Sequence, residues 1–282
     1  MTFKSVFLAC ALSFVSLGLS YAPIALAHDV ESHDAKARYL ANSAVLIAQG
    51  ETKVLFDPLF HNDFGQYQLV PDDVRVGILQ GFGIFSGVDA VFISHAHGDH
   101  FDAGDANQYM NNHQNVRFIA PMQAIEAMKK HEDWQDGFDS RITAIDLDYG
   151  DTPLDIHVGE IKASAVRIPH AGWPDPRRVS VQNMVYRVSL GEGATVMHMG
   201  DADPRPQHYT PFADHWQAVE TDTAFPPYWF FLSPNGATIL SDTLNVKDAI
   251  GVHVPTNVPE RLQDSGAQFF YESGQVVGIK HP

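Results

Sequence analysis

The chain has 282 residues, of which 45% are hydrophobic and 18% are charged, and its formal net charge is −16. This length and composition predict one large globular core, and the negative charge argues against a nucleic-acid partner and against binding to anionic membranes. The sequence holds a single cysteine, Cys10, so it offers no disulfide pair.

The first residues of the chain have the pattern of a secretory signal. A lysine near the start is followed by a largely apolar run over residues 6–19, and residues 25–27 end in the small-x-small pattern of a cleavage site. Serine, glycine and proline interrupt the apolar run, which makes it short for a membrane span of about 20 residues. We expect residues 1–27 to be a cleaved signal peptide and residues 28–282 to form one domain. The expected location is therefore periplasmic or secreted, without stable membrane insertion.

Three strands are predicted next, at 38–40, 44–48 and 53–56, separated by short turns. Asp57 closes the third strand, and the proline after it predicts an extended backbone at Asp57. Asp57 is interpreted either as a carboxylate that orients a metal-bound histidine or as an ordinary turn residue. Residues 60–87 read as a long loop whose aromatic side chains form either a lid or a small core.

A short buried strand at 91–93 runs directly into a segment rich in metal-binding side chains. His95 and His97 are two residues apart, so along an extended segment both imidazoles point the same way and can reach one metal ion. A glycine turn then carries Asp99 and His100 to a second position. A histidine-rich loop can also be merely solvated, but the ordered sequence of strand, alternating ligands and glycine favours a metal site.

Alternating apolar segments and turn residues continue to the end of the chain. Strands are predicted at 116–120, 141–146, 154–158, 161–168, 184–188, 195–199, 228–232, 251–254 and 275–279, and helices at 121–130, 235–244 and 259–264.

Three of these later strands end in further candidate ligands, namely His170, Asp201 and His253. A lone histidine is more often structural or solvated than a ligand. We therefore interpret these three residues as ligands only because they follow the histidine-rich segment in order, each at the end of a strand. His28 and His33 lie in the polar lead-in of the expected mature domain, where they could bind a metal, although a frayed terminus is favoured. The other histidines are given no role: His61, His113, His131, His157, His198, His208, His215 and His281.

The pattern His95-x-His97-x-Asp99-His100, followed in order by the three later residues, resembles the signature of the metallo-β-lactamase superfamily. The resemblance covers most of the chain from about residue 38 to residue 281. It implies an α/β fold, a four-layer αββα sandwich with the ligands along one edge of paired sheets. The turn at 42–43 and the segment 55–58 are similar to the branch that contains ascorbate-phosphate lactonases and N-acyl-phosphatidylethanolamine phospholipases.

The resemblance also implies two divalent metal ions, with zinc expected first and manganese or iron(II) compatible with the same ligands. It assigns one ion to His95, His97 and His170, assigns the other to Asp99, His100 and His253, and makes Asp201 the bridge between them.

The activity implied is that of a binuclear hydrolase, in which a metal-bridging hydroxide cleaves an ester, lactone, thioester or phosphodiester bond of a small-molecule substrate. Asp99 is then the catalytic residue that steers the nucleophile and takes its proton. True β-lactamases of this fold often carry a cysteine in place of Asp201, so the carboxylate points away from lactams. Two alternatives stay open: iron-dependent oxygen or sulfur chemistry on the same fold, and a catalytically silent metal-binding protein.

Substrate specificity is expected to come from loops at 60–87, 171–178 and 223–233. Two arginines of the second loop, Arg177 and Arg178, either bind an anionic group of the substrate or lie in a solvated turn. Asp203, two residues beyond Asp201, is expected to tolerate replacement.

Overall fold

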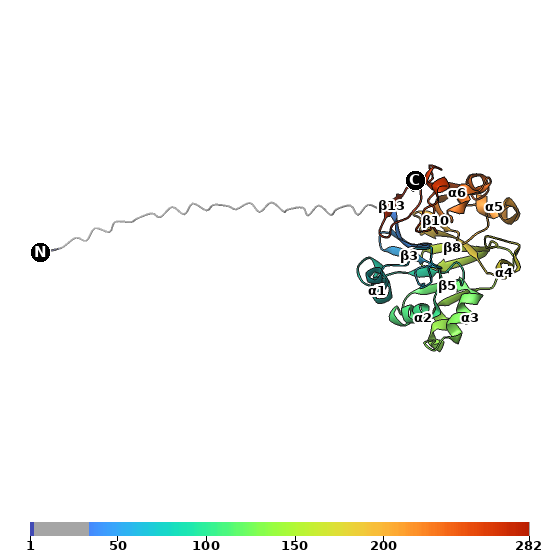
Figure 1. Ribbon diagram of the computed structural model, residues 1–282. Helices are drawn as coiled ribbons and strands as arrows, with labels where there is room; N and C mark the ends of the chain where they lie inside the picture. Colours follow the sequence, from blue (N-terminus) through green and yellow to red (C-terminus); the bar gives the residue numbers. More distant parts are fainter. Residues whose placement is uncertain (3–33, 282) are drawn as a thin grey trace. The chain divides into compact units, whose positions relative to one another are not determined.

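The computed structural model describes residues 1, 2 and 34–281, and residues 34–281 belong to one compact unit (Figure 1). Almost all of the expected signal peptide lies outside the described residues. No helix in the described part of the chain is long and apolar enough to cross a bilayer.

One mixed sheet is built from seven strands and begins with an antiparallel meander at the start of the domain. After this meander the next three strands pair in parallel, each added at the outer edge, and the last strand of the chain pairs antiparallel with the first strand at the opposite edge. In order across the sheet the strands are β13 (Val276–Ile279), β1 (Ala35–Ala41), β2 (Ala44–Gln49), β3 (Thr52–Phe56), β4 (Ala90–Phe92), β5 (Arg117–Pro121) and β6 (Ile142–Ile145).

The second sheet has six strands, antiparallel at one end and parallel at the other. Across this sheet the order is β12 (Val246–Ala249), β11 (Thr221–Phe225), β10 (Thr195–His198), β9 (Met184–Leu190), β8 (Ile161–Arg167) and β7 (Leu154–Val158).

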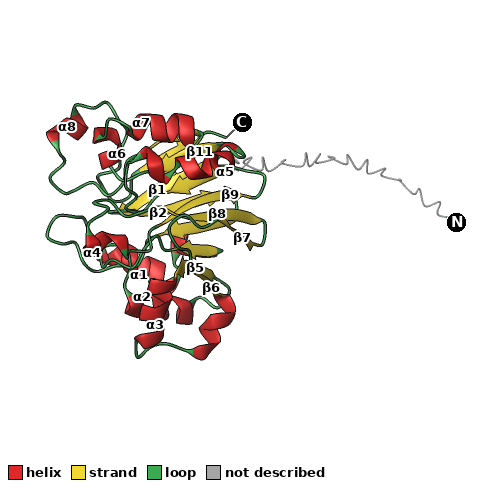
Figure 2. Ribbon diagram, turned by 90° about the vertical axis from the view of Figure 1, so that its right-hand side faces the viewer, coloured by secondary structure: helices red, strands yellow, loops and turns green. Residues whose placement is uncertain are grey.

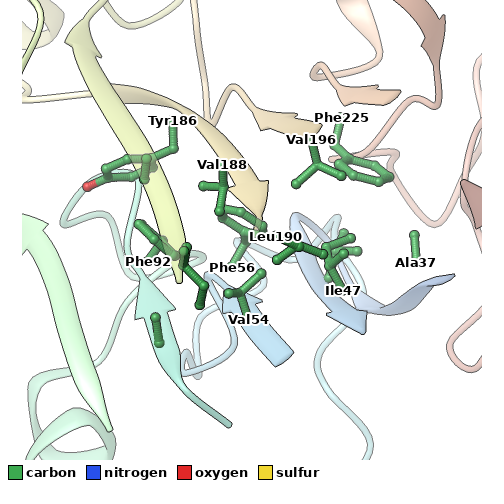
Figure 3. Packing of buried hydrophobic residues seen from close by; sticks show 14 of the residues in the cluster. Ala37, Ile47, Val54, Phe56, Phe92, Tyr186, Val188, Leu190, Val196 and Phe225 are labelled. Atoms are coloured by element: carbon green, nitrogen blue, oxygen red, sulfur yellow. The ribbon is translucent and has the colours of Figure 1, made fainter. Parts of the chain in front are cut away.

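The two sheets pack face to face over a shared apolar core (Figure 3). Because side chains alternate between the faces of a strand, Val54 and Phe56 of β3 enter this core while Leu55 between them faces the opposite way. In β10, Val196 enters the same core and Met197 faces outward. Each sheet therefore has a second apolar face that must be covered.

Helices cover both outer faces, as Figure 2 shows. The helices α1 (Asp72–Gln80), α2 (Ala103–Asn112) and α3 (Met122–Lys130) pack on the first sheet, and α5 (Ala213–Gln217), α6 (Trp229–Leu232), α7 (Gly236–Thr238) and the π-helical turn η5 (Ile239–Thr243) pack on the second. The shorter elements are α4 (Pro176–Val179), α8 (Glu260–Gln263), η1 (Gly83–Phe85), η2 (Asp136–Arg141), η3 (Pro206–His208) and η4 (Thr210–Phe212). The layers run helix, sheet, sheet, helix, which confirms the predicted αββα fold.

Three predictions of secondary structure are wrong. The aromatic segment 228–232 is helical. The side chain of Phe230 is buried against the second sheet, and the indole N–H of Trp229 donates to the Ala202 carbonyl at 3.0 Å, so both residues hold the helix in place. Segment 251–254 forms isolated bridges, and the regular strand of this region, β12, comes earlier. The expected long loop at 60–87 contains helix α1, which has two acidic residues in its first turn and the left-handed Gly81 at its end.

Candidate metal centre

The histidine-rich segment begins where β4 ends, at the edge of the first sheet. The amide of Ile93 still donates to the Ile119 carbonyl, and the chain then leaves the sheet and turns, with the His100 amide donating to the His97 carbonyl at 3.0 Å. A side chain at Gly98 would come within 3.0 Å of Asn62, so the turn closes tightly against the neighbouring loop. The turn directs the side chains of His95 and His100 into the protein, where both are fully buried.

The three distant candidates reach the same place from the second sheet. His170 follows β8 and forms a bridge with Ala202, and Asp201 follows β10. His253 lies beyond β12 in a left-handed conformation with a φ of 60°. All seven residues predicted as ligands therefore converge at one edge of the paired sheets.

One group of possible ligand atoms comes from His95, His97, His170 and Asp201. His97 Nδ1 lies 3.1 Å from His95 Nε2 and 3.2 Å from His170 Nε2. Asp201 Oδ2 lies 3.1 Å from His170 Nε2 and 3.9 Å from His95 Nε2. Three imidazole nitrogens and one carboxylate oxygen thus surround a common point.

A second group contains His100, His253 and Asp201, with Asp99 beside it. Asp201 Oδ1 lies 3.2 Å from both His100 Nε2 and His253 Nε2. Asp99 Oδ2 accepts from His253 Nε2 at 3.1 Å and lies 3.7 Å from His100 Nε2. The two oxygens of Asp201 therefore face different sets of histidines.

Burial holds two of the histidines in the neutral form that binds a metal ion. In the metal-free site burial opposes protonation of His100, but the carboxylates of Asp201 and Asp99 raise its pKa well above the ordinary value. Burial and the neighbouring His170 lower the pKa of His97 to about 4, and burial and the neighbouring His100 lower the pKa of His95 well below its ordinary value. Burial opposes ionisation of Asp201, but the nearby His253 and His100 lower its pKa well below the usual range. Near neutral pH, His95 and His97 are thus neutral with free lone pairs, and Asp201 is a carboxylate.

Unsatisfied polar atoms support the same interpretation. His100 Nε2 and Asp201 Oδ1 are buried without a hydrogen-bond partner, although they lie only 3.2 Å apart. Buried polar atoms are normally paired, so such a convergence needs an explanation, and a shared cation supplies one. The nitrogen and oxygen donor set fits zinc, manganese or iron(II).

Asp57 orients one of the candidate ligands, as predicted by its interpretation as a carboxylate that contacts a metal-bound histidine. Its side chain is fully buried and accepts hydrogen bonds from the Ser94 amide and the Ser94 hydroxyl, both at 2.6 Å. Asp57 Oδ2 also lies 2.8 Å from His100 Nδ1, which orients that ring and turns its Nε2 towards Asp201.

The backbone of Asp57 is left-handed, with a φ of 45°, so the prediction of an extended conformation is wrong. Aspartate tolerates this region better than most residues, and its buried hydrogen bonds hold it there.

The turn between β1 and β2 ties the two halves of the site together, a role that the sequence did not suggest. Asn42 Nδ2 donates to the Asp99 carbonyl at 2.8 Å, and the Asn42 carbonyl accepts from the His253 amide at 2.8 Å. His198, which was given no metal-binding role, is buried under this turn, and its Nε2 lies 2.9 Å from the Ser43 carbonyl. Only the local pair Asn42–Ser43 marked this turn in the sequence.

The backbone before Asp201 is shaped by close packing. Gly200 has a φ of 52°, and a Cβ atom there would lie 2.6 Å from Ser94 Cβ. The amide of Asp201 donates to Asn183 Oδ1 at 2.9 Å, which holds the carboxylate at the junction of the two groups. Asn183 is a further supporting residue that the sequence analysis missed.

A pocket of about 350 Å³ opens above these groups. Its wall includes the site residues His97, Asp99, Asp201 and His253 together with Phe64, Gln66, Tyr67 and Arg178. Two of the three loops expected to set specificity, 60–87 and 171–178, thus contribute to the pocket. From the third loop, the Trp229 ring lies 5.3 Å from the His253 ring.

One other expectation, that Asp203 tolerates replacement, needs revision. Asp203 is buried, and its Oδ1 lies 3.5 Å from Arg205 Nε and 3.6 Å from His208 Nε2, so it is not a neutral position for replacement. His61 lies beside Asp102 and Asp105, but Arg75 already forms a short ion pair with Asp105 there. This second acidic group is therefore satisfied by an arginine.

A family model described as a β-lactamase superfamily domain matches residues 36–214. No curated protein sequence matches the chain at a significant level. An isothiocyanate hydrolase from Delia radicum gut bacteria is similar in structure, with a TM-score of 0.59, 11% identity, and coverage of 86% of this chain and 98% of that one. A metallo hydrolase from Ignicoccus hospitalis gives a TM-score of 0.50 at 14% identity, covering 88% and 99%. A diiron β-hydroxylase from Streptomyces venezuelae gives 0.54 at 14% identity, covering 88% of this chain and 54% of that one.

Proposed function

This chain belongs to the β-lactamase superfamily, and we propose that it is a binuclear metal-dependent hydrolase that cleaves an ester, lactone, thioester or phosphodiester bond in a small molecule. The observation that carries this proposal is the placement of Asp201. Its Oδ2 faces His170 at 3.1 Å, and its Oδ1 faces His100 and His253 at 3.2 Å each. A carboxylate directed at two clusters of imidazoles is suited to bridging two cations.

In this proposal His95, His97 and His170 hold one cation, Asp99, His100 and His253 hold the other, and Asp201 contacts both. Two divalent cations held together would lower the pKa of a shared water to about 7 and would polarise a carbonyl or phosphoryl oxygen. Zinc is the first candidate, and manganese or iron(II) fit the same donors.

Asp99 is the residue of the chain that we propose to act on the attacking water. Its side chain is buried but lines the pocket. In the metal-free site burial opposes ionisation, but the charge of His100 and the hydrogen bond from His253 lower the pKa of Asp99, so it is a carboxylate at neutral pH. Such a carboxylate can orient a water molecule and accept its proton. The contact from Asn42 to the Asp99 backbone keeps this position constant.

Metal analysis combined with a substrate screen tests the proposal. The purified chain should contain about two divalent ions, and the loaded protein should hydrolyse at least one of the four bond types. Chelation should abolish the activity, and re-addition of zinc or manganese should restore it. A two-metal protein that hydrolyses none of the four would contradict the proposal. Iron as the sole metal, together with oxygen consumption, would instead favour the oxygen chemistry of the diiron β-hydroxylase that shares this fold.

We also propose that the protein is exported and acts in the periplasm or outside the cell. The support is the sequence of residues 1–27, with its apolar run and its small-x-small end. Mass spectrometry of exported protein should show a chain that begins at His28. Soluble protein that retains its first residues in the cytoplasm would refute export.

A further inference from the structure

Arg178 is an exposed cation in the wall of the pocket. Its Nη1 lies 3.4 Å from His170 Nε2, and the side-chain stem passes over Gly172, where an added Cβ would lie 3.5 Å from Arg178 Cγ. The Arg178 amide donates to the Asp175 carbonyl at 2.8 Å at the start of α4. The local backbone therefore directs this guanidinium towards the pocket.

The neighbouring arginine has a different environment. Arg177 binds Asp175 through two contacts, Nη2 to Oδ2 at 2.7 Å and Nε to Oδ1 at 3.1 Å, and its side chain is 87% exposed. Arg178 forms no ion pair with a carboxylate of residues 34–281. Of the two arginines, only Arg178 both lines the pocket and keeps its charge uncompensated.

We propose that Arg178 binds an anionic group of the substrate, a carboxylate or a phosphate, that lies close to the scissile bond. This inference rests on the proposed function. Once the Nε2 lone pair of His170 is committed to a cation, it no longer accepts a hydrogen bond, and the guanidinium is free to bind a ligand. A planar guanidinium can bind a carboxylate or a phosphate through two parallel hydrogen bonds.

The charge distribution favours the same class of substrate. The chain as a whole has a formal net charge of −16, so its surface disfavours anions. Inside the pocket, however, Arg178 and two divalent cations would outweigh the carboxylates of Asp99 and Asp201. The metal-loaded pocket is thus a local positive region in an acidic protein.

The size and the remaining wall of the pocket suit a small ligand. A volume of about 350 Å³ is near the lower end of the range for small-molecule sites. Phe64, which is 55% exposed, and Tyr67, whose ring lies 4.1 Å from the His253 ring, line it. We expect the uncharged part of the substrate to pack against these two rings while Arg178 holds the anionic part.

Binding can be measured without any reaction. Inorganic phosphate and acetate are titrated separately into the zinc-loaded full chain by calorimetry, for the wild type, Arg178→Gln and Arg177→Gln. Loss of a charge-assisted hydrogen bond should weaken binding of at least one anion about 10- to 100-fold in Arg178→Gln. The matched Arg177→Gln control should change it less than about twofold, and metal content should be equal in all three proteins. Unchanged binding of both anions in Arg178→Gln, or an equal loss in the control, overturns the inference.

A kinetic comparison adds a second readout. The neutral ester 4-nitrophenyl acetate and the anionic ester 4-nitrophenyl hydrogen succinate are compared in the same proteins. Arg178→Gln should raise KM for the anionic ester about tenfold or more and leave that of the neutral ester within about twofold. Equal effects on both esters would count against anion recognition. If the zinc-loaded wild type hydrolyses none of the four bond types, the proposed function fails, whereas the titrations still decide whether Arg178 binds anions.

Discussion

Replacing Asp57 by alanine should destabilise the protein and weaken metal binding, although Asp57 is not one of the seven proposed ligands. The side chain is fully buried. It accepts from the Ser94 amide and hydroxyl at 2.6 Å each and lies 2.8 Å from His100 Nδ1. The variant would remove the acceptor of all three groups at once.

The size of the effect follows from what remains after the change. The Ser94 hydroxyl still lies 3.0 Å from His95 Nδ1 and 3.4 Å from His100 Nδ1, so the Ser94 amide loses its only acceptor and His100 Nδ1 keeps only this longer contact. An unsatisfied buried donor costs about 1–3 kcal/mol, so with one donor unsatisfied and a second weakened we expect a loss of roughly 3 kcal/mol in the free energy of unfolding. Loss of an outer contact to a metal-binding histidine typically weakens metal affinity about 10- to 100-fold.

Urea unfolding of the metal-free protein measures the first quantity, and competition with a chelator of known zinc affinity measures the second. Asp57→Asn keeps an acceptor for the Ser94 amide and a residue that tolerates the left-handed backbone, so it should lose less stability than Asp57→Ala. The exposed Asp248 provides the control Asp248→Ala, which should alter neither quantity. A loss of less than about 1 kcal/mol in Asp57→Ala, with unchanged zinc affinity, would refute this account of the site.

Three further predictions concern the same region. Asp201→Ala should reduce the metal content from about two ions per chain towards one, measured by elemental analysis, and should lower the steady-state rate of hydrolysis roughly 100-fold or more. The control Asp248→Ala should keep both ions, and retention of both ions in Asp201→Ala would contradict the bridging role. Gly200→Ala should lower the free energy of unfolding by roughly 3 kcal/mol, because the backbone at residue 200 has a φ of 52° and the new Cβ would lie 2.6 Å from Ser94 Cβ. Thermal unfolding measures this loss, and an unchanged midpoint would show that the backbone can relax. In the metal-free protein the imidazole of His97 should titrate near pH 4 in a ring-proton NMR titration, and a midpoint near 6.5 would be inconsistent with its burial. Because the folded pKa lies below the unfolded value of 6.5, His97 should make the metal-free protein less stable as the pH falls from 6.5 towards 4, with no contribution above this range.

The strand at 53–56 was predicted well from a short continuous apolar run. Residues 54–56 are all apolar because Val54 and Phe56 enter the core between the sheets while Leu55 meets the helices on the other face. The aromatic segment 228–232 was predicted wrongly, because its residues favour strands in general but pack here as a short helix under the second sheet. Propensity is a weak signal where a few buried side chains decide the local conformation.

The sequence by itself determined the chemistry of the candidate site. Four candidate ligands follow one short strand, and their spacing can be read directly from the sequence: His95, His97, Asp99 and His100. The later ligands also follow strands, and the ends of strands at one edge of a sheet lie close together. The fold followed from the same residues through their resemblance to a family that the chain proved to belong to.

Only the tertiary structure decided how the site is supported and what it faces. Asp57 supports His100, Asn42 joins Asp99 to His253, and Arg178 rather than Arg177 reaches the pocket. The first two depend on contacts between residues far apart in the chain. Asp57 meets His100 because β3 pairs with β4 in the first sheet, and Asn42 meets His253 where the two sheets stack. The periodicity of a sequence reports only burial and local conformation. Arg177 and Arg178 are adjacent and chemically identical, so their different roles arise solely from the direction that the fold gives to each side chain.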